Sequence, residues 1–318
     1  MKEYLRPEKS TYLSFSEWYI VFSSEEYTQF IAHHHPSAFP YFSSIRQFWF
    51  VYRQTLNLVK SEYGIRLSEY VLWLIMGISF SAEYALKGLY EHTIGRITEY
   101  ASLGKKTAED QFAYEVSREY TEFIYDYPWY EFPFIQKVGG LWKLPFFGIH
   151  FIRKWERRII LSLEYVAKAL YGKITDIIIS GMFGNITNEI YATVTKVPMH
   201  IFETEKRIKK VEEVESGKYI IALPRYRLFT DNVSILVAAG GEFVDIAGNS
   251  YLLITIIAPR EWECKLPEST VLFTMKILTN PDMQRVAIKV SVQSLHRIIK
   301  ELKQSRIKLE HLYEYQMI

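Results

Sequence analysis

Two stretches of the chain carry nearly the same six residues, EYTQFI at positions 26–31 and EYTEFI at positions 119–124. The match extends without a gap from residues 24–49 to residues 117–142, an offset of 119 − 26 = 93. Both copies contain a Phe-Pro pair and end on a tryptophan. This similarity constrains the fold strongly, because a repeated sequence is expected to form a repeated structural unit.

A second pair of blocks follows in the same order. SAEYALKGLY at 81–90 matches SLEYVAKALY at 162–171, with an offset of 164 − 83 = 81. The second copy therefore has 93 − 81 = 12 fewer residues between the blocks. We predict an internal duplication with copies at about 24–95 and 117–180. Each copy would form a helix, a Phe-Pro turn, a helix and a longer helix, and the copies would pack about a pseudo-two-fold axis.

Hydrophobic periodicity predicts the fold class. Tyr27, Phe30 and Ile31 fall on one face of a helix, and helical patterns continue to about residue 179. After about residue 189 the pattern alternates, which is typical of strands. We therefore predict an α+β protein with an internally duplicated all-helical domain at 1–188 and an antiparallel ferredoxin-like α+β domain at 189–318.

The expected elements of the C-terminal part can be given as ranges. The charged run at 203–218 is either a linker or an exposed hairpin that turns at 215–217. Helices are expected at 225–239 and 291–305. Strands are expected at 191–197, 219–223, 242–247, 251–258, 270–278, 285–290 and 307–315.

Charge and cysteine content exclude some classes of function. The net charge of +2, from 38 basic and 36 acidic residues, gives no electrostatic footprint for nucleic acid. Cys264 is the one cysteine of the chain, and the N-terminus has no apolar core of signal-peptide length, so a cytoplasmic location is expected. The most apolar stretch, 70–82, is charge-free for 13 residues, whereas a membrane span needs about 20.

Aromatic residues make up 16% of the chain. Tyr and Trp favour interfaces, including the headgroup layer of a membrane. The segment WKLPFFGIHFIRKWERR at 142–158 mixes aromatic and basic residues and suits an anionic membrane face on the inner side of a membrane, or a protein partner. The alternative is a core helix with a charged outer face. The surface candidates are Trp142, Lys143, Phe146, Phe147, Arg153, Lys154, Trp155, Arg157 and Arg158.

Four acidic residues occupy matched positions of the two copies: Glu26, Glu83, Glu119 and Glu164. A carboxylate-bridged metal bundle also needs histidine three residues after two of its glutamates. Here that position holds leucine or alanine, and the next holds Lys87 or Lys168, so no metal site is predicted. The interpretation is two Glu-Lys pairs, Glu83 with Lys87 and Glu164 with Lys168, placed on the surface or at the repeat interface.

No nucleotide-binding or nucleophile motif occurs in the sequence, and no catalytic residue or cofactor is predicted. We expect an accessory or binding protein whose helical domain engages a membrane interface or a protein partner, with a regulatory or assembly role for the α+β domain. The alternative is a degenerate ferritin-like carboxylate-bundle enzyme acting on a hydrophobic substrate. The sequence leaves the oligomeric state open.

Overall fold

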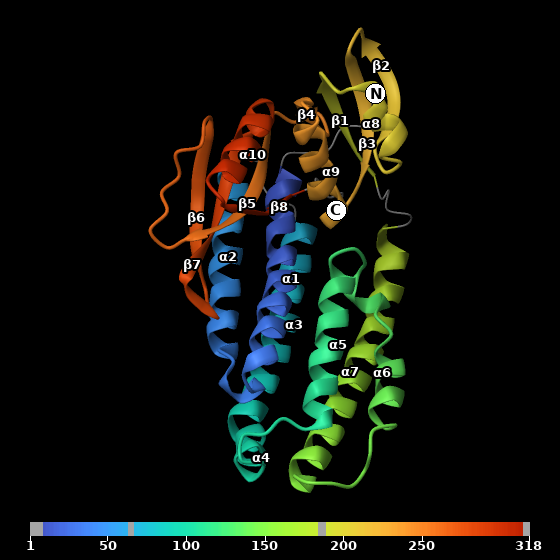
Figure 1. Cartoon of the computed structure of the whole chain (residues 1–318), viewed down its shortest axis with the longest axis vertical. Helices are drawn as coiled ribbons and strands as arrows, with labels where there is room; N and C mark the ends of the chain where they lie inside the picture. Colours follow the sequence, from blue (N-terminus) through green and yellow to red (C-terminus); the bar gives the residue numbers. More distant parts are fainter. Residues whose placement is uncertain (1–8, 63–66, 184–188, 314–318) are drawn as a thin grey trace. The chain divides into compact units, whose positions relative to one another are not determined.

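The computed structural model describes residues 9–62, 67–183 and 189–313 (Figure 1). A helical region is followed by two four-stranded antiparallel sheets, which confirms the α+β class. The chain forms two compact units. The helical unit contains residues 19–49 and 72–185, and the sheet unit contains residues 1–18, 50–71 and 186–318. The sheet unit thus also takes two segments that the sequence analysis placed in the helical domain.

In the part of the chain that the structure describes, seven α-helices precede the sheets. They are α1 (Lys9–His33), α2 (Tyr41–Glu62), α3 (Leu67–Tyr90), α4 (Arg96–Ala101), α5 (Ala108–Ile124), α6 (Phe134–Leu141) and α7 (Phe151–Phe183). A π-helical turn at Glu91–Gly95 joins α3 to α4. Helix α5 begins at a capping box, in which the Thr107 hydroxyl accepts from the Asp110 amide and the Asp110 carboxylate accepts from the Thr107 amide.

The two similar stretches of sequence have similar local geometry. Each has a 3₁₀ turn at the same place, Pro36–Ala38 and Trp129–Glu131, and the next helices begin at Tyr41 and Phe134, again 93 residues apart. The Tyr27 and Phe39 rings lie 5.1 Å apart at 86°, and those of Tyr120 and Phe132 lie 5.2 Å apart at 80°. The indole N–H of Trp49 donates to Ser81 at 2.9 Å, and that of Trp142 donates to Ser162 at 2.9 Å.

The helical unit is packed by aromatic rings and closed on one side by small polar residues. Phe39, Tyr41, Phe80 and Tyr84 form a buried cluster, and Phe132, Phe134 and Tyr165 form another. Helix α1 contacts α5 through hydroxyl groups, with Thr28 Oγ1 at 3.0 Å from Thr121 Oγ1 and 2.6 Å from Ser117 Oγ. Small side chains at this contact allow the two helices to approach closely.

The sheet unit contains two sheets of the same strand order. The first has the order β2-β3-β1-β4, from β1 (Glu189–Thr195), β2 (Lys209–Glu215), β3 (Lys218–Pro224) and β4 (Glu242–Ile246). The second has the order β6-β7-β5-β8, from β5 (Tyr251–Pro259), β6 (Ser269–Ile277), β7 (Asn280–Ser291) and β8 (Lys308–Leu312). Helix α8 (Met199–Thr204) follows β1, α9 (Arg227–Ala238) precedes β4, and α10 (Leu295–Gln304) precedes β8.

One hydrophobic core joins both sheets to α9 and α10, with buried residues such as Val233, Leu236 and Ile298. The first part of α1 belongs to this unit and also packs on the second sheet. The Phe15 ring lies 5.1 Å from Phe273 of β6, and the Trp18 ring stacks 3.6 Å from His311 of β8. The strands and helices expected in this part of the chain are present with shifts at their ends, although residues 314–315 of the last expected strand lie outside the described residues. The charged run forms a hairpin rather than a linker, with β2 exposed. Helix α8 was not predicted.

Two helical glycines give a test of packing in the helical unit. A Cβ on Gly88 of α3 would lie 2.8 Å from the Cβ of the fully buried Tyr41, whereas a Cβ on Gly139 of α6 would meet nothing within 4 Å. Alanine is favoured over glycine in a helix by about 1 kcal/mol. We therefore expect Gly139→Ala to stabilise the protein by about 0.5–1 kcal/mol. Gly88→Ala should destabilise it by about 1 kcal/mol, because overpacking costs about 1–3 kcal/mol.

Urea unfolding of the two variants beside wild type measures this difference. A Gly88→Ala protein as stable as Gly139→Ala would contradict the close approach of α3 to Tyr41.

Candidate functional site

Four of the residues singled out in the sequence meet where α3 contacts α7. Lys87 Nζ lies 3.1 Å from Glu164 Oε1, and Lys168 Nζ lies 2.8 Å from Glu83 Oε1. Lys168 also lies 3.0 Å from Glu164 of its own helix. The sequence predicted the pair of Glu83 with Lys87 within one helix. The predicted pair of Glu164 with Lys168 is present, whereas Lys87 bonds Glu164 and Glu83 bonds Lys168 of the other helix, so the four charges link α3 to α7.

Burial and charge set the ionisation of this group. Burial alone would raise the pKa of Glu164, but the adjacent Lys87 and Lys168 ammonium groups outweigh it and hold that pKa below its ordinary range. Burial would likewise lower the pKa of Lys87, and Glu164 instead raises it. The pKa of Lys168 is raised by Glu83 and Glu164 against the same effect of burial. Glu164, Lys87 and Lys168 therefore remain charged at neutral pH.

Glu26 and Glu119 do not join this group. Glu26 is buried on α1, and Glu119 is half-exposed on α5, where it forms an ion pair with Lys137. Within the part of the chain that the structure describes, no three His, Cys, Asp or Glu side chains are grouped so that they could hold a metal ion.

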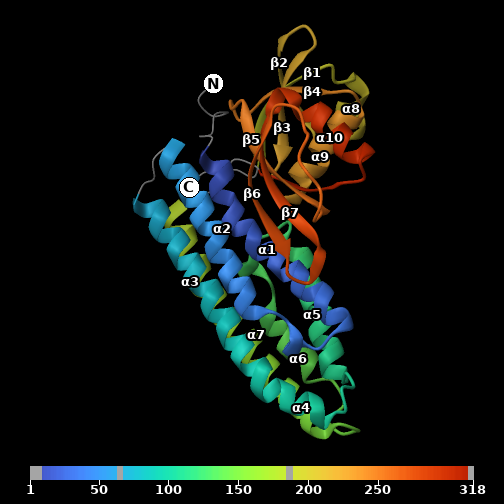
Figure 2. The same ribbon diagram turned by 90° about the vertical axis from the view of Figure 1, so that its left-hand side faces the viewer.

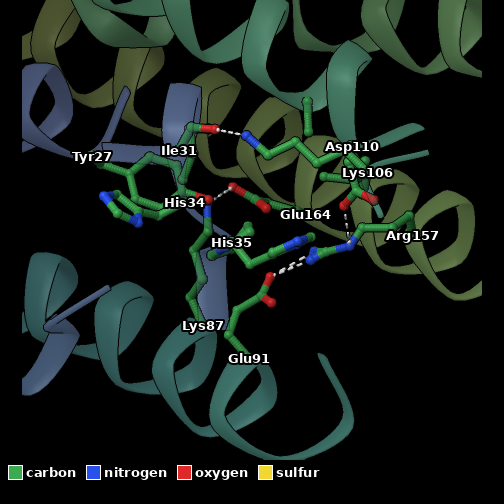
Figure 3. Close-up of a pocket in the computed structure, with 13 residues that line it drawn as sticks. Tyr27, Ile31, His34, His35, Lys87, Glu91, Lys106, Asp110, Arg157 and Glu164 are labelled. Carbon is green, nitrogen blue, oxygen red and sulfur yellow. Dashed lines mark hydrogen bonds and ion pairs between the residues drawn. The ribbon is translucent and has the colours of Figure 1, made fainter. Parts of the chain in front are cut away.

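The ion pairs border two small cavities in the helical unit. One has a volume of about 70 Å³ and is lined by Lys87, Glu164 and Lys168 with the tyrosines Tyr27, Tyr84 and Tyr120. The other has a volume of about 20 Å³, and Lys87, Glu91, Asp110 and Arg157 converge on it (Figure 3). The smaller one has room for about one water molecule.

A second charged network lies beside the smaller cavity. The Arg157 guanidinium donates to Glu91 Oε1 at 2.5 Å, and Arg153 donates to Asp110 at 2.8 Å. Arg153 also donates to Glu156 at 3.1 Å. Burial alone would raise the pKa of Asp110, but Arg157 and Arg153 lower it. Every charge in the network has an opposite partner, as buried charges require.

Four of the five basic residues predicted to lie on a surface are in the interior. Arg153, Lys154, Arg157 and Arg158 are all buried. Arg158 donates to Glu109 at 2.5 Å, and the Lys154 ammonium donates to the carbonyls of Pro145 at 2.8 Å and Phe147 at 3.3 Å. These cations face inward because α7 turns them toward α5 and the chain at 144–147. This corrects the exposed basic face predicted for 142–158; of its basic residues, only Lys143 is exposed.

The aromatic residues of the same segment divide into two groups. Trp142, Phe146 and Trp155 surround the Arg158 guanidinium, with ring centres at 5.8, 4.6 and 5.7 Å. Phe147 and Phe151 are 80% and 49% exposed, and the aliphatic Ile149 between them is 82% exposed. Arg158 thus holds Trp142, Phe146 and Trp155 in place, while Phe147 and Phe151 are exposed to the exterior.

Exposed apolar residues gather around Phe147 at one end of the helical unit. This end is formed by residues 94–106 and 142–152, where α7 begins, and we call it the distal end (Figure 1). Arg153 joins the two segments by donating to the Gly95 carbonyl at 3.0 Å. Leu103 is 81% exposed. The other exposed large apolar residues here are Ile94, Ile97, Tyr100, Trp142, Phe146, Phe151 and Ile152.

Sequence reasoning missed the inward direction of the α7 cations, although a signal was present. Lys154, Arg158, Leu161 and Tyr165 recur at intervals of four, three and four residues, so the cations share a helix face with the buried Leu161 and Tyr165. No sequence pattern predicts that residues 94–106 lie beside residues 142–152, because this placement depends on the contact of α4 with the start of α7.

No family model, curated protein or solved structure matches the chain. Among the described residues, no helix is long and apolar enough to cross a membrane.

The α3–α7 ion pairs give a prediction about stability. Glu164 bonds both lysines and is 20% exposed, whereas Glu83 bonds one lysine and is 45% exposed. We expect Glu164→Ala to cost about 2–3 kcal/mol, because it leaves the partly buried Lys87 without its carboxylate partner and Lys168 with Glu83 alone. Glu83→Ala should cost less than about 1 kcal/mol. A urea double-mutant cycle with Lys87→Ala measures the coupling, and additive effects of Glu164→Ala and Lys87→Ala would contradict the pairing.

The pH dependence of stability follows from the same group. The pKa of Glu164 is lowered in the folded protein, so its contribution is present above the unfolded value of about 4.3 and is lost as pH falls below that value. Wild type should therefore lose stability more steeply than Glu164→Gln between about pH 5 and pH 3. Acid unfolding of both proteins is followed by circular dichroism. If wild type and Glu164→Gln lose stability equally over this pH range, the assigned role of Glu164 is wrong.

Proposed function

We propose that the helical unit binds the surface of an anionic membrane with its distal end. The proposal rests on the observation that the distal end combines exposed apolar residues with exposed charged residues that are all positive. The exposed charged side chains of residues 94–106 and 142–152 are Arg96, Lys105, Lys106 and Lys143. Glu99 is the one acid of these two segments, and it is half-buried and accepts a hydrogen bond from Ser37.

Both features suit a membrane interface. Apolar side chains enter the boundary between headgroups and acyl chains to a depth of about 5–10 Å, and each nearby Lys or Arg contributes about 1 kcal/mol on an anionic surface. Leu103, Phe147 and Ile149 would supply the apolar contact, since each is about four-fifths exposed. Arg96, Lys105 and Lys143 would then select anionic lipids over neutral ones, whereas the Lys106 ammonium donates to the carbonyls of Ile31 and Ala32 at 2.7 and 2.9 Å.

The buried cations of α7 support this function indirectly. Arg158 donates to the carbonyls of Leu144 and Pro145 at 3.3 and 3.2 Å, and Lys154 donates to those of Pro145 and Phe147. These bonds hold the backbone that carries Phe147. Because the segment is already ordered, less conformational entropy is lost on binding.

We also propose that the helical region is an internal duplication, and that the first sheet with its helices is ferredoxin-like. The matched 3₁₀ turns, ring pairs and tryptophan bonds support the duplication. The strand order β2-β3-β1-β4, with α8 and α9 in the two crossovers, supports the ferredoxin-like topology. A regulatory or assembly role for the sheet unit remains part of the proposal.

Vesicle binding tests the apolar part of the site. We expect Phe147→Glu to weaken binding of the full chain to vesicles that contain about 30% anionic lipid by at least about 10-fold, because a buried charge replaces an inserted ring. The matched control is Ile135→Glu, since Ile135 is 54% exposed on α6 outside the distal end. Equal binding by wild type and Phe147→Glu, or no binding by wild type, would overturn the proposal.

Charge reversal tests the lipid selectivity. The double variant Lys105→Glu and Lys143→Glu should lose most of the preference for anionic over neutral vesicles, and its binding should depend less on salt concentration than that of wild type. The double variant Arg118→Glu and Lys303→Glu changes the net charge equally at exposed positions outside the distal end and is the control. Unchanged selectivity in the double variant would contradict the role of these cations.

A further inference from the structure

A second apolar surface lies along α3 and α7, apart from the distal end. On α7, exposed residues recur every three or four positions, and on α3 they do the same over a shorter length. We call these residues the α3–α7 face. Its members are Ile75, Ile78, Leu86 and Leu89 of α3, and Ile159, Leu163, Val166, Leu170, Tyr171, Ile174 and Ile177 of α7.

Both stripes lie on the same side of the helix pair. The two helices are antiparallel and adjacent, because Lys87 pairs with Glu164 and the earlier Glu83 pairs with the later Lys168 (Figure 2). With about 100° per residue, each stripe lies about half a turn from the buried positions of its own helix. On each helix the ion-paired residues lie between the exposed stripe and the buried positions, and they face the other helix. The two stripes therefore lie next to each other and form one outer surface.

The α3–α7 face carries almost no charge as far as Tyr171, and the exposed Lys173 and Asp176 lie at its end beside Ile174 and Ile177. Between Ile159 and Tyr171, every exposed residue of α7 is apolar, and the ionisable side chains of that stretch are only partly exposed and turned toward α3. Between Ile75 and Leu89, Glu83 is the one exposed charged residue, and it is neutralised by Lys168. Isolated exposed apolar residues are normal, but a continuous surface of this kind marks an interaction site.

We propose that a second copy of this chain covers the α3–α7 face. Two adjacent helices make a surface about 20 Å wide, and the stripe from Ile159 to Ile177 is about 27 Å long, which gives about 540 Å² in flat projection. The relief of the side chains raises the accessible area toward the roughly 800 Å² per partner of a standard dimer. The two-helix face of one copy fits that of another as a four-helix layer of aliphatic side chains.

The composition of the face favours a protein over a membrane. Its side chains are aliphatic apart from Tyr171, whereas the aromatic rings and exposed cations that suit lipid headgroups are at the distal end. Core regions of homodimer interfaces are depleted in charge in the same way. The four ion-paired residues would lie beneath the dimer contact and hold α3 and α7 at a fixed spacing.

Light scattering after size-exclusion chromatography tests the proposal on the full chain without vesicles. Wild type should be a dimer at about 10 µM. The double variant Leu86→Glu and Leu170→Glu should raise the dimer dissociation constant at least about 100-fold, because it places like charges in an apolar contact. The control Ile135→Glu and Val211→Glu adds the same charge at exposed apolar positions elsewhere and should remain a dimer.

A wild type that is monomeric up to about 100 µM, or a Leu86→Glu and Leu170→Glu protein that stays dimeric, would overturn the proposal. Circular dichroism of both double variants, with Leu86→Gln and Leu170→Gln as a milder pair, separates lost dimerisation from lost folding. A monomeric wild type that loses vesicle binding in the Leu86→Glu and Leu170→Glu variant would assign the face to lipid instead. Phe147→Glu should remain dimeric, so failure of the membrane proposal and failure of the dimer proposal give different results.

Discussion

The structure of the helical unit depends on the inward direction of the charged residues of α7. Arg153, Arg157 and Arg158 are buried, and each has an acidic partner within 2.8 Å. Removing such charges from water is costly unless they are paired, so α7 is held close to the elements that carry Glu91, Glu109 and Asp110. The opposite side of α7 is then left to apolar residues. The apolar exterior and the charged interior are two consequences of one helix orientation.

The charged interior also distinguishes the two ends of the helical unit. Under the offset of 81 residues, Arg157 corresponds to Met76 and Gly172 corresponds to Glu91, so the second network occurs beside the distal end only. At the other end, Gly172 allows the Tyr130 backbone to approach where Glu91 would stand. If the two stretches arose by duplication, the copies differ most at the end to which we assign membrane binding.

Local sequence patterns were sufficient to predict many elements but not their tertiary contacts. The Phe-Pro pairs located both 3₁₀ turns, and alternation located most strands, because these features depend on near neighbours. The pairing of Lys87 with Glu164 was not predictable, since Glu83 satisfies the same four-residue spacing within α3. Which glutamate pairs with Lys87 depends on the contact of α3 with α7, and no short sequence pattern predicts that contact. The α7 cations show the same limit, because their basic character is evident in the sequence and their partners are distant in it.

The most direct test of the membrane account is hydrogen–deuterium exchange of the full chain with and without anionic vesicles. Added vesicles should slow amide exchange at residues 96–105 and 143–151, because insertion removes those segments from water. Exchange in the exposed strand β2 should remain unchanged. Slower exchange confined to the sheet unit, or no change at the distal end when vesicles are bound, would contradict the central claim that the distal end is the membrane-binding surface.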